Sequence, residues 1–250
     1  MLKKEFTGVT HYPIYSNQTN AQAEISVSSL IELLIDAASR HAEQWGFGFR
    51  DLIKNNHAWV LARLAFDMSR YPRIEETLTI ETWVESFNRH FTTRNFRLLD
   101  QKLNVIGYAR SVWSVIDFKT RDSVDITQYE EIGKLLQVLP CPIEKPGRLG
   151  TVTQDEGLTY RVKVSDLDIN RHMTSSRYVD HLLDLFPLED FDNSRIGRFE
   201  VQYMNEALYN ENILLKKEKQ EDGSYLLEMN NSQGTALCKC KCIFINSLNI

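Results

Sequence analysis

The sequence has no hydrophobic run long enough to span a membrane. Its most apolar stretch, "SLIELLIDAA", is interrupted by Glu32 and Asp36 and is about half the length that a bilayer crossing requires. The opening "MLKKEFTGVTHYPIY" contains two lysines with no apolar segment behind them, so no secretory signal is expected. These absences predict a cytoplasmic protein without membrane insertion.

The chain also lacks an excess of positive charge. Its 29 Lys and Arg residues are outnumbered by 34 Asp and Glu residues, which gives a net charge of -5. Nucleic-acid-binding proteins usually carry a basic surface. We therefore expect no nucleic-acid partner, although this balance is compatible with one local basic patch for an acidic protein.

Cysteine is scarce, and three of the four cysteines alternate in "CKCKC". Alternate positions cannot form a disulfide framework, and C-x-C-x-C lacks the C-x2-C spacing and second ligand group of a zinc site. The alternation predicts a strand with Cys238, Cys240 and Cys242 on its buried face and Lys239 and Lys241 facing water. The sequence also lacks H-E-x-x-H and paired histidines, so no metal or cofactor is expected.

What the chain does contain is one order of elements written twice. In the first half, "SSLIELLIDAA" has the spacing of a buried helix with a capping box of Ser29 and Glu32. Four segments rich in β-branched and aromatic residues follow. In the second half, "SSRYVDHLLDLF" predicts a helix that Pro187 ends, again with four strand-like segments behind it. The stretch from Arg63, "RLAFDMSRYPRIEETLTIE", aligns without gaps with "RFEVQYMNEALYNENILLK" from Arg198.

A helix laid on an antiparallel sheet, present twice, predicts an α+β protein. One helix wrapped by such a sheet is the hotdog arrangement. The expected fold is therefore a double hotdog, two tandem units each with a long helix packed on a curved antiparallel β-sheet. The N-terminal unit is expected at residues 1–135 and the C-terminal unit at residues 156–250. The linker, residues 136–155, lies within a stretch that has three prolines and three glycines.

The segment "DLDINRH" sets polar groups on alternate positions just before the second predicted helix. His172 can transfer a proton near neutral pH, Asp168 can fix its tautomer, and Asn170 can orient a carbonyl or a water. A helix N-terminus favours developing negative charge. Hydrolysis of an activated acyl group needs these components. Asp166, earlier in the row, is assigned to capping the turn instead.

An internal control favours a site in the second half only. The matching loop of the first half, "SNQTNAQAE", has no histidine and no aspartate. Glu206 is a further candidate at a bend between two predicted strands, and the gapless alignment places Tyr71 at its equivalent position. A turn glutamate is usually solvated, so spacing alone leaves both interpretations open. Without G-x-S-x-G or a cysteine near His172, we expect attack by water or by a carboxylate.

These segments resemble the acyl-[acyl carrier protein] thioesterases, a family of plant plastid enzymes and shorter bacterial relatives. "DLDINRHMTSSRYVDHLLD" is similar to the family's D-x-D-[IV]-N-x-H segment and the helix behind it, and "VQYMNEALYNE" is similar to its E-Y-R-R-E-C region. "RNFRLLD" and "ARSVWSVIDFKTR" resemble its R-x-[WF]-x-[LI]-x-D and A-x-S-x-W segments. The resemblance implies a bacterial protein of fatty acid biosynthesis with a double hotdog fold. It also implies hydrolysis of the thioester between a fatty acyl chain and phosphopantetheine.

The resemblance assigns functional positions to Asp168, Asn170, His172 and Glu206. The family's cysteine after that glutamate is Ala207 here, which rules out a nucleophilic cysteine at this position. In its place we expect Glu206, with His172, to activate water. Asn170 would polarise or orient the thioester carbonyl, and Asp168 would position the site.

The resemblance further implies an acyl-tail tunnel in the first half and acyl carrier protein as partner. Four residues are expected to line the tunnel: Leu34, Ala38, Trp59 and Leu61. Because the carrier protein is acidic, the docking surface should be locally basic. Arg89, Arg94 and Arg97 are candidates because they cluster in sequence. The fused fold is compatible with a monomer or a homodimer.

Three other activities fit the same pattern. An acyl-CoA thioesterase would act on the same phosphopantetheine arm with a different donor. A hotdog enoyl hydratase or dehydratase would use an Asp–His pair without Glu206. A non-catalytic acyl-binding regulator would bind acyl chains and turn nothing over.

Overall fold

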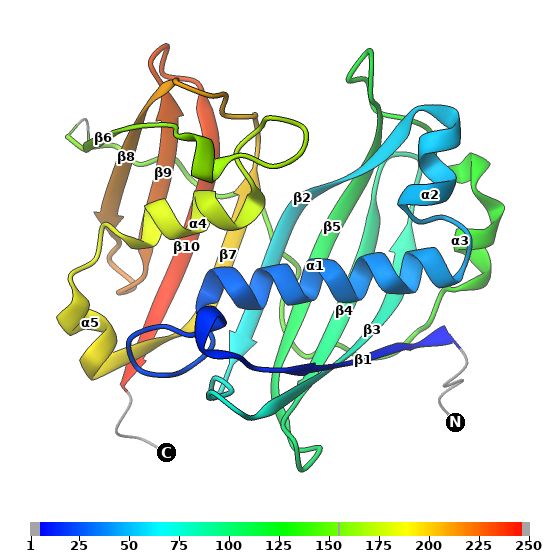
Figure 1. Ribbon diagram of the computed structural model, residues 1–250, viewed down its shortest axis with the longest axis horizontal. Coiled ribbons are helices and arrows are strands. Elements are labelled where there is room, and N and C mark those ends of the chain that lie inside the picture. The colour runs from blue at the N-terminus through cyan, green and yellow to red at the C-terminus, as the bar shows by residue number, and fades with distance from the viewer. Residues whose placement is uncertain (1–5, 155, 247–250) are drawn as a thin grey trace.

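The computed structural model describes residues 6–154 and 156–246, and ten strands in this part of the chain form one antiparallel sheet (Figure 1). Their order is β1-β3-β4-β5-β2-β7-β10-β9-β8-β6. The first half contributes β1 (Gly8–Pro13), β2 (His57–Met68), β3 (Thr77–Phe87), β4 (Thr92–Leu99) and β5 (Val105–Asp117). The second half contributes β6 (Leu158–Arg161), β7 (Ser194–Tyr203), β8 (Asn212–Lys219), β9 (Tyr225–Asn231) and β10 (Ala236–Asn246).

The main helices, α1 (Val27–Gln44) and α4 (Ser175–Leu183), lie on the same face of the sheet (Figure 1). The shorter helices are α2 (Phe49–Leu52), α3 (Glu130–Lys134) and α5 (Leu188–Asn193), with 3-10 turns η2 (Ser16–Gln18), η3 (Ile53–Asn55), η4 (Ile126–Gln128) and η5 (Val164–Asp166). The predicted double hotdog is confirmed. One difference is that α4 has 9 residues against 18 in α1, so only the first unit has a long helix.

Helix α1 begins one turn earlier than the sequence suggested. Ser26 is the N-cap, because its side chain accepts a hydrogen bond from the backbone N–H of Ser29 at 3.1 Å. The predicted capping box of Ser29 and Glu32 is therefore wrong. The apolar stripe is buried as the helical spacing predicts, and its members are Leu30, Leu33, Leu34, Ala37 and Ala38.

The halves join through β2 and β7 in the middle of the sheet. Arg63 lies opposite Gln202, and Asp67 lies opposite Arg198. The gapless alignment equates Arg63 with Arg198 and Asp67 with Gln202. Exchanging the two halves therefore turns the Arg63–Gln202 pair into the Arg198–Asp67 pair. Pairing of this kind relates the halves by an approximate two-fold axis, which places their helix N-termini at opposite ends of one interface.

Strand β10 has the predicted cysteine face, with Cys238, Cys240 and Cys242 fully buried. The prediction that Lys239 faces water is wrong, since only 7% of this residue is exposed. Its ammonium group donates to the carbonyl of Gly150 at 3.1 Å. The segment between the halves thus crosses the sheet face that the helices leave free, and it covers Lys239.

Candidate functional site

The polar row forms a tight loop between η5 and α4. The carboxylate of Asp168 accepts hydrogen bonds from the backbone N–H groups of Asn170, at 2.8 Å, and His172, at 3.1 Å. The backbone N–H of Asp168 donates to the carbonyl of His172 at 2.8 Å. Arg171 adopts the left-handed conformation, with φ of 66°. Asp168 therefore shapes the loop that presents the imidazole.

His172 meets Glu206 from the loop between β7 and β8. Nδ1 of His172 lies 3.2 Å from Oε1 of Glu206, with 26% and 42% of the two side chains exposed. Backbone contacts hold the two loops together, because the N–H of Met173 donates to the carbonyl of Ala207 at 3.0 Å. The phenol oxygen of Tyr178, in α4, accepts from the N–H of Ala207 at 2.7 Å. A proton-transferring ring and a carboxylate thus meet where a substrate can reach them.

Asn170 lies in the same loop, and its side chain does not bond to the His172–Glu206 pair. Among the described residues it donates only to Asp168, at 3.2 Å, through one of its two amide hydrogens. The residue is exposed. Its second amide hydrogen is therefore available to the carbonyl oxygen of a bound substrate.

Arg121 is a site residue that the sequence analysis missed. Its guanidinium forms an ion pair with Oε1 of Glu206, the same oxygen that His172 approaches. Arg121 follows β5 in the first half, so this contact joins residues of the two units. The only signal in the sequence was the family-like segment "ARSVWSVIDFKTR", which ends at Arg121.

Asp166 is structural, as its assignment to the turn anticipated. Only 3% of the residue is exposed, and its carboxylate accepts from Tyr160 Oη at 2.8 Å and lies 3.0 Å from Nε2 of His181. Burial raises the pKa of Asp166, but hydrogen bonds from the Lys163 backbone, Tyr160 and His181 outweigh burial and hold this pKa below its usual value. Its hydrogen bonds within the described part of the chain are with Tyr160, the Lys163 backbone and His181, and none is with His172 or Glu206.

The first-half loop repeats the same backbone arrangement with other side chains. The carboxamide oxygen of Asn20 accepts from the N–H groups of Gln22, at 3.1 Å, and Glu24, at 3.0 Å. The N–H of Asn20 donates to the carbonyl of Glu24 at 2.8 Å, and Ala23 has φ of 58°. Asn20, Gln22 and Glu24 thus correspond to Asp168, Asn170 and His172.

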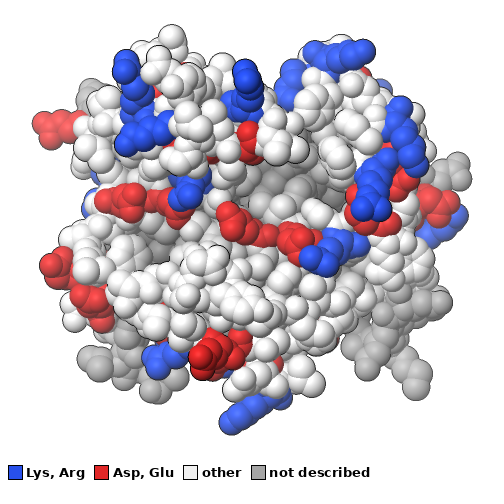
Figure 2. All heavy atoms as spheres, viewed as in Figure 1, with Lys and Arg blue, Asp and Glu red and all other residues white. Residues whose placement is uncertain are grey.

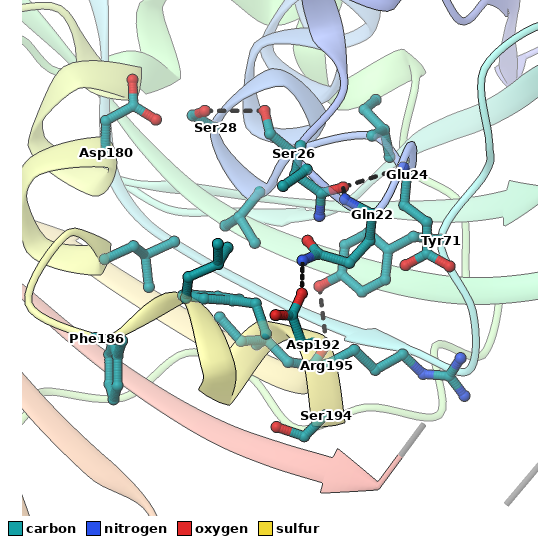
Figure 3. Close-up of a pocket in the computed structure, with 18 of the residues that line it drawn as sticks. Gln22, Glu24, Ser26, Ser28, Tyr71, Asp180, Phe186, Asp192, Ser194 and Arg195 are labelled. Carbon is teal, nitrogen blue, oxygen red and sulfur yellow. Dashed lines mark hydrogen bonds between the residues drawn. The ribbon is translucent and has the colours of Figure 1, made fainter. Parts of the chain in front are cut away.

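This pseudo-equivalent site surrounds a cavity of about 520 Å³ between the α1 N-terminus and the α4–α5–β7 region, and several of its polar groups bind partners within the protein (Figure 3). Gln22 donates to Asp192 at 2.8 Å, and Glu24 lies 3.7 Å from the guanidinium of Arg73. Tyr71, which corresponds to Glu206, donates to a carbonyl of β7 at 2.8 Å. At this site Glu24 stands where the second half has His172, and Tyr71 stands where it has Glu206, so the imidazole–carboxylate pair is not repeated.

The four predicted tunnel residues lie between α1 and the first-half sheet. Leu34 and Leu61 belong to the packed core. Ala38 and Trp59 line a small cavity of about 40 Å³. Arg94 also lines this cavity.

The predicted docking arginines do not form one surface. Arg94 is 5% exposed, and its guanidinium contacts Nδ1 of His41 at 2.9 Å. It is therefore unable to meet a partner protein. Arg97 is paired with Glu81, and Arg89 points into solvent beside an acidic residue of another loop. In Figure 2, Lys and Arg instead gather along the edge above the loops that precede α4 and follow β5.

The described residues contain no group of three His, Cys, Asp or Glu side chains arranged to hold a metal ion. None of the described helices combines the length and the apolar character that a bilayer crossing requires.

Two units of helix on antiparallel sheet, fused edge to edge, define a double hotdog protein. Models of the acyl-ACP thioesterase N-terminal and C-terminal domains match residues 5–134 and 150–246. The chain belongs to the acyl-ACP thioesterase family.

Solved structures and curated relatives agree with this membership. An acyl-ACP thioesterase from Bacteroides thetaiotaomicron is 33% identical, with a TM-score of 0.91 over 98% of this chain and 100% of that one. The 12:0-ACP thioesterase from Umbellularia californica shares the fold, with a TM-score of 0.82, 20% identity and coverage of 97% and 98%. A dodecanoyl-[acyl-carrier-protein] hydrolase of Cinnamomum camphora is 28% identical over 78% of this chain and 55% of its own length. The chain thus spans little more than half of that curated relative.

Proposed function

We propose that this protein hydrolyses the thioester of fatty acyl-[acyl carrier protein], releasing free fatty acid and the carrier protein. The observation that carries the proposal is the contact between His172 and Glu206 at the exposed end of the unit interface. Membership of the acyl-ACP thioesterase family supports the choice of substrate. The expected cytoplasmic location stays a prediction.

The geometry suggests how Glu206 and His172 share the activation of water. Nδ1 of His172 lies 3.2 Å from Oε1 of Glu206. In the proposed reaction Nδ1–H donates a hydrogen bond to this carboxylate, which leaves the Nε2 lone pair free. Nε2 takes a proton from water as the water oxygen attacks the thioester carbonyl. Asn170 donates its free amide hydrogen to the carbonyl oxygen, which becomes negative. The carbon–sulfur bond then breaks, and the imidazolium returns its proton to the leaving sulfur.

A cysteine nucleophile is not part of this mechanism. Ala207 occupies the position next to Glu206 and is fully buried. Burial raises the pKa of the Cys240 thiol well above its usual value and that of Cys242 to about 12. Both thiols are inside the β10 core, so they stay protonated and inaccessible.

The two units have different roles in this proposal. The N-terminal unit, residues 1–135, would hold the acyl tail beside Ala38 and Trp59. The C-terminal unit, residues 156–250, would carry the catalytic side chains. The acidic carrier protein would dock at the site mouth, where Ile169 is 93% exposed and Arg171 is also exposed.

The test is release of free fatty acid from acyl-ACP and acyl-CoA of matched chain lengths. We expect hydrolysis of acyl-ACP to fall at least a hundredfold in His172→Ala and in Glu206→Ala. His90→Ala and Glu131→Ala, which change exposed residues in the β3–β4 loop and in α3, are the matched controls. No hydrolysis of either donor by the wild type would overturn the proposal.

The other activities give different results in the same assays. Faster turnover of acyl-CoA than of acyl-ACP would identify coenzyme A, and not the carrier protein, as the acyl donor. Enoyl hydration that persists in Glu206→Gln would identify a hydratase. Tight acyl-chain binding with no turnover, unchanged in His172→Ala, would identify a regulator.

A further inference from the structure

We propose that Arg121, from the first unit, is a positioning residue that holds Glu206 against His172 and so keeps Nε2 of the ring free for the attacking water. The inference rests on the proposed hydrolysis and extends it. It means that the first unit supplies part of the catalytic arrangement in addition to the space for the tail.

Arg121 is held in place by a well-defined turn at the end of β5. The carboxylate of Asp117 accepts from the backbone N–H groups of Lys119, at 2.8 Å, and Thr120, at 2.9 Å. The N–H of Arg121 donates to the carbonyl of Asp117 at 2.9 Å, and its φ of 65° closes the turn. Its guanidinium carbon also lies 6.0 Å from the centre of the Phe118 ring. The side chain therefore leaves the turn in a restricted direction, toward the second unit.

Glu206 needs such a partner because it lies on a loop with 42% of its side chain exposed. A glutamate of this kind would sample several rotamers in water. Arg121 and His172 both approach Oε1, and among the described residues no other side chain bonds to this carboxylate. A guanidinium favours the ionised form of a carboxylate. An ionised carboxylate carries no proton, so it can only accept a hydrogen bond, and Nδ1–H of His172 can supply one. Arg121 thus fixes the orientation of Glu206, and through it the tautomer of His172.

The pseudo-equivalent site supports a cross-unit role at this position. Tyr71 corresponds to Glu206, and its hydroxyl also bonds to the opposite unit, at the carbonyl of Ile196, 2.8 Å away. At both positions the loop side chain is therefore anchored by the other half. In the first half the anchor is a neutral backbone group, whereas in the second half it is a cation that matches a carboxylate.

Kinetics with an acyl-pantetheine thioester, which lacks the carrier protein, separate this role from docking. We expect Arg121→Gln to lower kcat roughly tenfold with KM nearly unchanged, because the loss falls on the base and not on substrate contacts. Arg121→Lys should recover part of kcat by restoring the charge. Arg89→Gln, the control, removes another exposed arginine that is paired with a carboxylate, Asp125, 3.1 Å away, and should leave kcat unchanged.

A second readout does not depend on activity. In the ¹⁵N NMR spectrum of neutral His172, wild type and Arg89→Gln should show the proton on Nδ1, while Arg121→Gln should show a mixture of tautomers. An unchanged tautomer together with an unchanged kcat in Arg121→Gln would overturn the inference. If the wild type hydrolyses no thioester, the proposed function fails, but the tautomer measurement still decides whether Arg121 orders the pair.

Discussion

The buried pair of His41 and Arg94 predicts a specific dependence of stability on pH. His41 lies in the last turn of α1 with 2% of the residue exposed. Its Nδ1 is 2.9 Å from the guanidinium of Arg94, which can only donate, so the ring nitrogen is the acceptor. Burial, together with the Arg94 charge, lowers the pKa of His41 from 6.5 to about 3. The folded protein therefore keeps this ring neutral at mildly acidic pH.

The sign and size of the effect follow from proton linkage. Below pH 6.5 the unfolded chain binds a proton on His41 that the folded chain does not bind until about pH 3. The contribution of His41 is thus fully present above pH 6.5 and is lost as the pH falls. Each pH unit costs about 1.4 kcal/mol of unfolding free energy. At pH 5 the loss from this residue is therefore about 2 kcal/mol.

The assay is urea unfolding at pH 7.5 and pH 5 of wild type, His41→Gln and His90→Gln. Glutamine can still accept from Arg94 through its amide oxygen, but it does not titrate. We expect the loss of unfolding free energy between the two pH values to be about 2 kcal/mol smaller in His41→Gln than in wild type. His90 is exposed, and its variant controls for removing a histidine. An equal loss in His41→Gln and wild type would refute the reasoning.

Substitutions at three further positions test other parts of the structure. Asp168→Asn should keep the melting temperature and most of the hydrolysis, because Asn20 makes the same backbone contacts in the first half. Asp168→Ala should lose at least about tenfold in kcat. Equal activity of the two variants would contradict the positioning role. Asp166→Ala should lower the unfolding free energy by about 3 kcal/mol in urea titrations, since it strands buried hydrogen-bond partners, with kcat of the folded protein kept. Ala38→Leu should fill the small first-half cavity and shift hydrolysis toward shorter acyl-ACP substrates; an unchanged chain-length profile would place the tail elsewhere.

The fold was predictable because its signals are periodic and repeated. The alternation in β10 and the stripe along α1 mark buried faces directly, and the gapless alignment identified the segments of β2 and β7 as equivalent, although it did not predict that they pair. Details that depend on a covering segment were not predictable in this way. Lys239 alternates correctly with its buried neighbours, yet the segment around Gly150 covers it. Alternation along a strand shows which residues share a face of the sheet, but it does not show whether another segment covers that face.

The candidate site was predictable only within one unit. The "DLDINRH" row and Glu206 come from the second half, and their approach follows from two adjacent loops. The contact of Arg121 with Glu206 depends on how the halves pair, which no local pattern encodes. Arg94 shows the converse error, because clustering with other arginines in sequence says nothing of its burial between helix and sheet.

The two pseudo-equivalent loops differ in which of their polar side chains are engaged within the protein. The two loops make matching hydrogen bonds to their backbone N–H groups, so they differ in the chemistry and the partners of their side chains. In the first half, Gln22, Glu24 and Tyr71 each bind a partner within the protein, and such satisfied groups stabilise a fold without acting on a substrate. In the second half, no described residue bonds to Nε2 of His172 or to the second amide hydrogen of Asn170. Leaving these two groups without a protein partner gives up the stability that pairing would supply. In the proposed complex, the water binds Nε2 of His172 and the substrate carbonyl binds the amide of Asn170, so both groups gain partners.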